Sequence, residues 1–394
     1  MESDHPPVTA FQRLLARAQH VGVNVARPAA SDVDANARFP FEAFAALREE
    51  RLLSAAVPET FGGAGLSISE IATICTALGQ HCSATAMVYA MHQIQVASIV
   101  RFGQSAPLLR ALLSDISERQ LLLASATSEV GVGGDMRSSI CAIETEGERF
   151  QVEKNASVIS YGEHADAILL TARRTPTSPA NDQCVVYLRK GEYQLTQTTT
   201  WNTMGMRGTC SPGFKVVAEG HVGQILPTSF GDIAAQSMVP YSHIVWSALW
   251  LGIATDAVSR AHAYVRADAR RRPGTLPFGA QRLAVATNKL QSLRSNVHDA
   301  TRAYSEFWTL PDAAEALSGI GPAIRWNNLK VTASEMSVDI IRDAMAVCGM
   351  AGFSNDSKFS MGRQLRDATS AQLMIANDRI HTTTANLLLV YKDD

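Results

Sequence analysis

Two histidines and one stretch near the C-terminus hold the groups of this sequence that could move a proton. His243 follows Ser242 in PYSHIVWSALW, and the ordinary pKa of an imidazole, about 6.5, suits a general base. His92 lies in YAMHQIQVA, where it could contact a substrate, although a single histidine on an apolar helix face is also typical of a core residue. The stretch LRDATSAQLMIANDRI places the apolar Ile375 among polar residues that include Asp378.

Two further stretches have the composition of ligand-binding segments. The loop ATSEVGVGGDMRS (126–138) contains Gly133 and Gly134, which allow a backbone to approach a ligand closely. It is not a phosphate-binding P-loop, because no Gly-Lys-Ser/Thr follows, and GVGG alone is also typical of a flexible turn. The run RADARRRPG (266–274) includes Arg271 and ends a helical pattern, where cations also suit the helix dipole.

Composition excludes several classes of protein. The 394 residues carry a formal charge of −2, which argues against nucleic acid or an anionic membrane as the partner. Six cysteines occur without a CxxC pair, which disfavours a disulfide framework or a zinc centre and fits reduced thiols in a cytosol. The N-terminus lacks a signal-peptide pattern, and no apolar run of about 18 residues occurs. We therefore expect a cytoplasmic protein with no metal and no membrane span.

Hydrophobic periodicity divides the chain into three parts. Residues 1–120 have helical spacing, residues 121–230 form short β-branched runs such as RFQVEKN, AILLTAR and QCVVYLR, and residues 231–394 return to helical spacing. The last part contains four helical blocks, at 240–270, 281–308, 323–348 and 368–391. The predicted fold class is α+β, mainly α, with an N-terminal helical domain, a middle antiparallel β-domain and a C-terminal four-helix bundle. Strands do not alternate with helices, which disfavours a Rossmann-type sheet.

Several motifs, in this order, resemble those of the acyl-CoA dehydrogenase family. They are VPETFGGAGLS (57–67), ATSEVGVGGDMRS (126–138), NASVISYGEHADAILLTAR (155–173), WNTMGMRGTCS (201–211), VCGMAGF (347–353) and LRDA (365–368). The resemblance spans about residues 40–385 and implies an FAD flavoprotein that forms a homodimer or homotetramer. It implies an acyl thioester substrate, on CoA or a carrier protein, and an electron acceptor such as an electron-transfer flavoprotein or O2. In the family a carboxylate removes the α-proton while hydride leaves to the flavin.

The resemblance also assigns ligand contacts to individual positions. Ser128 keeps the hydroxyl of a flavin-contacting threonine, whereas Gly134 lacks a serine hydroxyl that the family has. Val158 replaces a tryptophan that packs on the flavin, which leaves room for a larger substrate or for oxygen. The implied cofactor contacts are Thr127, Ser128, Gly133, Gly134, Val158, Ser160, Arg271, Gly349, Asn377 and Arg379. For the diphosphate contact, Arg270 and Arg272 are alternatives to Arg271. The implied substrate contacts are His92, Gly134 and His243.

The catalytic glutamate of the family has no counterpart here. Counting from Arg366 places Ile375 at its position, and the alternative position on an earlier helix holds Ser242 and His243. Three readings remain open. The chain could dehydrogenate an acyl thioester with another base, either His243 or, after a shift of three residues, Asp378. It could be a flavin-dependent monooxygenase or oxidase, or it could bind an acyl thioester or flavin without turnover. The histidines that monooxygenase relatives tend to carry after the RDA motif are not seen at Ala371 or Met374, which weakens the second reading.

Overall fold

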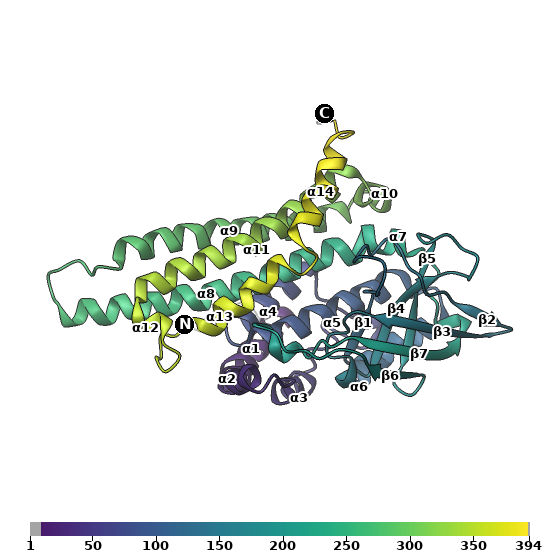
Figure 1. The fold of residues 1–394 in the computed structure, drawn as a ribbon, viewed down its shortest axis with the longest axis horizontal. Helices are drawn as coiled ribbons and strands as arrows, with labels where there is room; N and C mark the ends of the chain where they lie inside the picture. Colours follow the sequence, from purple (N-terminus) through teal and green to yellow (C-terminus); the bar gives the residue numbers. More distant parts are fainter. Residues whose placement is uncertain (1–8, 393–394) are drawn as a thin grey trace, which may run out of the picture.

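Helices form the first and last parts of the chain and strands the middle part in the computed structural model, which describes residues 9–392 (Figure 1). This confirms the predicted fold class. The N-terminal helices are α1 (Ala10–Val21), α2 (Arg27–Ala35), α3 (Phe41–Glu49), α4 (Ile68–Gly79), α5 (Ser83–Phe102) and α6 (Pro107–Arg119). Ser67 caps the N-terminus of α4: its hydroxyl accepts a hydrogen bond from the Glu70 N–H, and the Glu70 carboxylate accepts one from the Ser67 N–H. Helix α5 is buried on nearly all sides, as its apolar sequence requires.

The middle part contains two sheets. One has the order β1 (Leu123–Ala126), β4 (Ala167–Arg173), β5 (Gln183–Arg189), and the other has the order β2 (Glu144–Glu146), β3 (Arg149–Ala156), β7 (Phe214–His221), β6 (Tyr193–Gln197). The second sheet is antiparallel throughout, but β1 pairs with β4 in parallel. The expectation of a purely antiparallel domain was therefore wrong at β1. The segment between β1 and β4 passes through the second sheet, and such a long connection permits a parallel pair.

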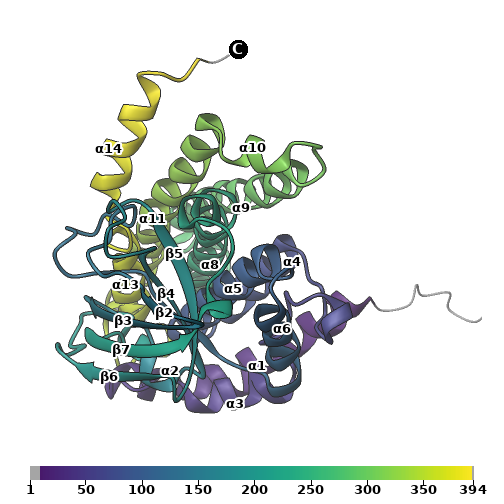
Figure 2. The same cartoon turned by 90° about the vertical axis from the view of Figure 1, so that its right-hand side faces the viewer.

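The C-terminal part is built on long helices that lie side by side (Figure 1). They are α8 (Val239–Arg271), α9 (Ala280–Phe307) and α11 (Ile320–Cys348), with the short helices α7 (Phe230–Ile233), α10 (Ala313–Leu317) and α12 (Met350–Phe353) beside them. The fourth predicted block is not one helix: α13 (Gly362–Thr369) and α14 (Asn377–Leu388) are separated by a turn in which Ile375 has φ +49°. A left-handed residue cannot continue a right-handed helix, so α14 leaves the bundle and projects outward (Figure 2).

Close packing of α8 against the N-terminal helices fixes the centre of the molecule. A Cβ atom on Gly252 of α8 would overlap the carbonyl oxygen of Thr76, and one on Gly79 of α4 would overlap that of Leu249. The two helices therefore cross backbone to backbone, which only glycine permits. Across residues 9–392, no helix combines the length and the apolar character that crossing a membrane requires.

Candidate functional site

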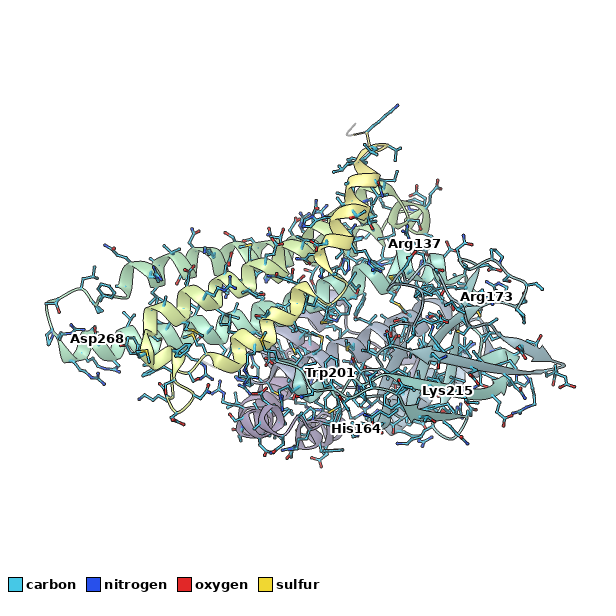
Figure 3. The ribbon with its side chains drawn as sticks, viewed as in Figure 1. Arg137, His164, Arg173, Trp201, Lys215 and Asp268 are labelled. Atoms are coloured by element: carbon cyan, nitrogen blue, oxygen red, sulfur yellow. The ribbon has the colours of Figure 1, made fainter. Side chains whose placement is uncertain are left out.

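The β-domain meets the C-terminal helices around the segment 201–211. Trp201, labelled near this junction in Figure 3, donates from Nε1 to the carbonyl of Met206 at 3.2 Å. The Met206 N–H donates to Oδ1 of Asp367 on α13 at 2.7 Å. Burial raises the pKa of Asp367, although this hydrogen bond acts in the opposite direction. A buried carboxylate thus ties the LRDA motif to the β-domain.

A buried ion pair shapes the glycine loop that follows β1. The Glu129 carboxylate accepts hydrogen bonds from the Ser139 hydroxyl at 2.7 Å and the Cys141 N–H at 2.7 Å, so both ends of the loop are joined. Lys154 on β3, which is fully buried, lies 3.4 Å from the same carboxylate. Burial acts to raise the pKa of Glu129, but Lys154 and these hydrogen bonds outweigh it and hold the pKa below its usual value. The loop is anchored in the domain core.

Hydroxyl groups and one exposed apolar side chain gather beside this loop. The Ser128 hydroxyl donates to the carbonyl of Val158 at 2.8 Å, and the Val158 side chain is 41% exposed. Ser160 accepts a hydrogen bond from Ser211 at 2.9 Å. Thr127 precedes Ser128, and its carbonyl accepts a hydrogen bond from the Thr171 hydroxyl on β4 at 3.5 Å. The structure thus brings four of the predicted cofactor residues to one edge of the β-domain.

Arg379 joins α14 to the glycine loop. Its guanidinium donates to the carbonyl of Gly133, and a Cβ atom on Gly134 would lie 2.8 Å from its Nη1. Both glycines have positive φ, +59° and +77°, which L side chains rarely adopt. Arg379 therefore occupies the space beside Gly134.

A lysine that the sequence analysis missed lies beneath Ile375. Lys330 on α11 is fully buried, and its Nζ donates to the Ile375 carbonyl and to Oδ1 of Asn377, both at 2.7 Å. The Asn377 amide in turn donates to the Ser334 hydroxyl at 3.0 Å. Burial lowers the pKa of Lys330 to about 8, while the nearby Glu335 carboxylate opposes this shift. The peptide carbonyl of Ile375 is thus held by a buried cation.

His243 has a defined tautomer. Its Nδ1 lies 3.0 Å from the carbonyl oxygen of Trp326, which can only accept, so Nδ1 carries the proton. Its Nε2 is buried and has no hydrogen-bond partner within the described range 9–392. The pKa of His243 is lowered to about 4, chiefly by burial; the nearby charge of Lys330 acts in the same direction, and the hydrogen bond to Trp326 opposes the shift. Ser242 donates to the Val239 carbonyl at 2.8 Å, so its hydroxyl serves its own helix.

His92 has a structural role in place of the substrate contact that the sequence suggested. Its Nε2 donates to the Leu53 carbonyl at 2.7 Å, and its Nδ1 accepts from the Leu123 N–H at 3.0 Å. Both ring nitrogens are therefore used, and the ring joins α5 to a loop and to β1. Burial lowers the pKa of His92 to about 4, so the ring stays neutral in the folded protein.

Arg271 and Gly349 lie away from the other predicted residues. Arg271 ends α8 and Gly349 ends α11, at the tip of the bundle that Asp268 marks in Figure 3. The β-domain, marked by Lys215, lies at the opposite end of the molecule. Within one chain, the structure does not bring these two residues to the site.

The sequence analysis did not single out Glu129, Lys154, Ser211 or Lys330, and only some of them could have been recognised from the sequence around them. Glu129 and Ser211 lie inside motifs that the sequence analysis singled out. Lys154 occupies an inward position of the alternating strand RFQVEKNA, which is a readable sign of a buried charge. In the sequence, Lys330 cannot be distinguished from a solvated lysine of a helix, because its partners Ile375 and Asn377 are distant in the chain.

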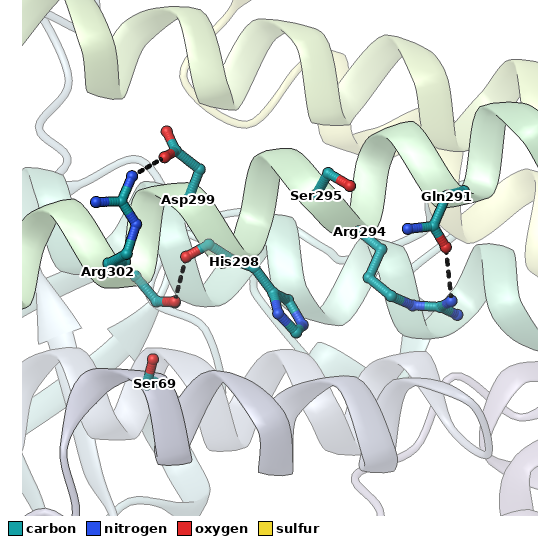
Figure 4. A pocket seen from close by; sticks show the side chains of 8 residues that line it. Ser69, Gln291, Arg294, Ser295, His298, Asp299 and Arg302 are labelled. Atoms are coloured by element: carbon teal, nitrogen blue, oxygen red, sulfur yellow. Dashed lines mark hydrogen bonds and ion pairs between the residues drawn. The ribbon is translucent and has the colours of Figure 1, made fainter.

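A groove elsewhere on the surface is not part of this site. It has a volume of about 590 Å³ and lies where α9 passes α4 (Figure 4). Its lining residues are polar: Ser69, Gln291, Arg294, Ser295, His298, Asp299, Thr301 and Arg302. Arg302 is paired with Asp299 at 2.6 Å, and Arg294 contacts Gln291 at 3.4 Å. Asp299 compensates the charge of Arg302, and the groove contains none of the predicted residues.

Comparison with known proteins agrees with the motif order. Residues 11–114 match the acyl-CoA dehydrogenase N-terminal domain and residues 231–384 the C-terminal domain of the same family. The chain is 24% identical over 380 residues to a cyclohex-1-ene-1-carbonyl-CoA dehydrogenase of Syntrophus aciditrophicus, covering 95% of this chain and 88% of the relative.

Two solved structures share the fold at low identity. Butyryl-CoA dehydrogenase from Megasphaera elsdenii has a TM-score of 0.79 at 18% identity, over 97% of this chain and 99% of the other. FMN-bound TdsC from Paenibacillus sp. A11-2 has a TM-score of 0.82 at 18% identity, over 97% of this chain and 98% of the other. The chain belongs to the acyl-CoA dehydrogenase family of flavin-dependent oxidoreductases.

Proposed function

We propose that this chain dehydrogenates an acyl thioester, with His243 as the base in place of the family glutamate. The supporting observation is the tautomer of His243: the Trp326 carbonyl holds the proton on Nδ1 and leaves Nε2 as a buried lone pair without a partner in residues 9–392. The relative from S. aciditrophicus is itself named for a dehydrogenase of a CoA thioester, which supports this class of substrate.

The residues at the edge of the β-domain fit a flavin. The Ser128 hydroxyl and the exposed Val158 side chain would face its ring system. The left-handed backbone at Gly133 leaves open space where a side chain would otherwise lie, and Arg379 brings a cation to the same loop. A diphosphate is the chemical group that such a loop and cation suit. FAD, the standard cofactor of the family, would supply the hydride acceptor there.

The pKa of His243 sets a condition on this mechanism. With a pKa of about 4 the ring is neutral at pH 7, so Nε2 is free to accept a proton. The same low value makes it a weak base, so the α-proton must first become more acidic. Hydrogen bonds to the thioester carbonyl provide that effect in a water-excluded site. Asp378 suits the base role less well, because its side chain is exposed in the first turn of α14.

The second candidate function is a flavin-dependent oxygenation or oxidation. It is favoured by the apolar, 37% exposed side chain of Ile375 and by the small Val158, which together would give the flavin face an apolar surface. TdsC is a dibenzothiophene monooxygenase on this fold. A site that binds acyl thioester without turnover is the third possibility, and the same experiment separates all three.

Anaerobic addition of acyl-CoAs to the flavin-loaded protein tests the proposal. We expect the flavin absorbance to bleach with at least one acyl-CoA, and we expect His243→Gln to slow bleaching by at least 10²-fold, within the range for general-base catalysis. His298→Gln, in the polar groove, is the matched control and should bleach at the wild-type rate.

The other outcomes identify the alternatives. Bleaching that is equally fast in His243→Gln removes the histidine from the mechanism. No bleaching, together with oxygen consumption when reduced flavin is supplied, identifies the oxygenase. A protein that binds both ligands and does neither is a binding protein. Reoxidation of the bleached enzyme by air or by an electron-transfer flavoprotein identifies the acceptor.

We also infer that the chain assembles into a homo-oligomer through the tip of the bundle. Four large apolar side chains are exposed there, on the α8–α9 connection and on α12: Leu276 (74%), Phe278 (99%), Met350 (76%) and Phe353 (68%). Exposed apolar groups of this size are characteristic of interaction surfaces. Arg271 and Gly349 lie at the same tip, so a second chain covering it would bring these cofactor candidates to a site that one chain does not complete.

Phe278→Asp is therefore expected to shift the protein to a smaller species in light scattering coupled to gel filtration, because a charge replaces an almost fully exposed ring at that surface. Val217→Asp is the control, since Val217 is an exposed apolar residue on β7, outside the bundle. An unchanged mass for Phe278→Asp would contradict this interface.

A further inference from the structure

Lys330 is fully buried, and burying its charge costs free energy unless the ammonium group is hydrogen-bonded. The side chain has no solvent exposure and reaches from α11 to the turn that precedes α14. Its Nζ has two acceptors at 2.7 Å, the Ile375 carbonyl and Oδ1 of Asn377. Neither acceptor carries a full charge, so burial is only partly compensated, in agreement with the lowered pKa of the amine.

The turn that Lys330 contacts is strained. Ile375 has φ +49°, a conformation that is unfavourable for a β-branched residue. The surrounding structure must therefore impose this conformation. Asn377 contributes by donating to Ser334 at 3.0 Å and to Glu335 at 3.2 Å, which attaches the start of α14 to α11. Lys330 contacts both the strained peptide and this asparagine.

The same turn determines where α14 begins, and thereby where Arg379 lies. Arg379 follows Asn377 by two residues in the first turn of α14 and donates to the Gly133 carbonyl in the β-domain. A continuous set of contacts thus runs from the buried amine, through Ile375 and Asn377, to the glycine loop.

We propose that Lys330 is a positioning residue of this site. It holds the Ile375 peptide in its left-handed conformation, and it thereby fixes both the Ile375 side chain at the former glutamate position and Arg379 on the Gly133–Gly134 loop. Lys330 acts through these residues and does not itself touch the substrate. The effect on flavin binding rests on the proposed function; the effect on the turn does not.

Hydrogen–deuterium exchange on the protein without flavin tests the effect on the turn. Lys330→Met keeps the length of the side chain and removes the ammonium. We expect amides of residues 373–380 to exchange at least tenfold faster, with little change elsewhere. Lys289→Met is the matched control: Lys289 lies on α9 of the same bundle and pairs with Asp343 at 2.7 Å, away from the turn. We expect the control to leave exchange in residues 373–380 unchanged.

A double variant separates positioning from simple packing. Asparagine tolerates the left-handed conformation better than isoleucine does. Ile375→Asn added to Lys330→Met should therefore restore part of the protection, whereas a lysine that only fills space would not be replaced in this way. Wild-type exchange in Lys330→Met, or no rescue by Ile375→Asn, would overturn the proposal.

Asn377→Ala decides the case in which Lys330→Met fails to fold. It removes one of the two acceptors and leaves the lysine in place. Asn377→Asp keeps the acceptor for Lys330 and loses the amide donors to Ser334 and Glu335. Faster exchange in residues 373–380 that is larger in Asn377→Ala than in Asn377→Asp supports the proposal, and unchanged exchange in Asn377→Ala or an equal increase in both variants overturns it. FAD titration of the folded variants is the second readout, with at least tenfold weaker binding expected for Lys330→Met. If the wild-type chain takes up no FAD, the proposed function fails, while the exchange experiment still decides the role of Lys330.

Discussion

Replacing Ile375 with glutamate in the His243→Gln variant is expected to raise the rate at which straight-chain acyl-CoAs reduce the bound flavin by about 10² to 10⁴, the contribution of a well-placed general base. The position follows Arg366 at the spacing of the family glutamate, and the side chain is 37% exposed, so a carboxylate would not have to be buried there. The backbone contact to Lys330 involves the carbonyl of residue 375 and does not depend on its side chain.

Two variants make this experiment specific. Ile375→Gln has nearly the shape of glutamate without its charge, and we expect it to give no increase. Leu373→Glu places a carboxylate on the same turn at a side chain that is 75% exposed, and it should also be inactive. Rates are measured by anaerobic stopped-flow absorbance with acyl chains of several lengths. An increase shared by all three variants would show that charge or polarity in the turn is responsible, and no increase in any would show that position 375 does not face the substrate.

Acidification from pH 6.5 to pH 4 is expected to lower the free energy of unfolding by about 3 kcal/mol for each of two buried histidines. His92 and His243 both have a pKa of about 4 in the folded protein, against 6.5 for an ordinary histidine. Between pH 6.5 and pH 4, both histidines bind a proton in the unfolded chain but stay neutral in the folded chain. The stabilisation is therefore complete above pH 6.5 and is lost as the pH falls toward 4.

Urea unfolding at a series of pH values measures this effect. Carboxylates also titrate in this range, so the useful quantity is the difference between the wild type and a variant. His243→Gln and His92→Gln should each be less stable than the wild type at pH 7 and should each show a flatter dependence on pH. His298→Gln, which removes a histidine from the surface groove, is the control for the substitution itself. Parallel pH profiles for all four proteins would contradict the assignment of these two histidines as neutral.

The fold was largely predictable because it depends on periodicity that is local in the sequence. Helix α5 is apolar on nearly all sides, and β3 alternates between exposed and buried residues along its whole length. The parallel pairing of β1 with β4 and the break before α14 depend on partners that are distant in the sequence. The sequence around Ile375 does not indicate a left-handed backbone conformation, because isoleucine is among the residues that adopt this conformation least readily.

The site was predictable only where motif order carried the information. The structure brings Ser128, Val158 and Ser160 together, and Arg379 onto Gly133 and Gly134, and their role as cofactor contacts stays a prediction. The type of a residue does not show its role. Both ring nitrogens of His92 form hydrogen bonds, whereas Nε2 of His243 has no partner within residues 9–392, and this difference depends on the folded structure. Lys330 escaped detection for the same reason: its partners, Ile375 and Asn377, are 45 and 47 residues away in the chain.

The glycine-to-glycine crossing of α4 and α8 has a consequence for redesign of the enzyme. Because Gly79 and Gly252 leave no room for a methyl group, this crossing fixes the register of the helix that carries His243. A mutant library aimed at new substrates should therefore leave both glycines invariant. It should vary the exposed positions Val158 and Ile375, where a change in side-chain volume does not move the helix that carries the proposed base.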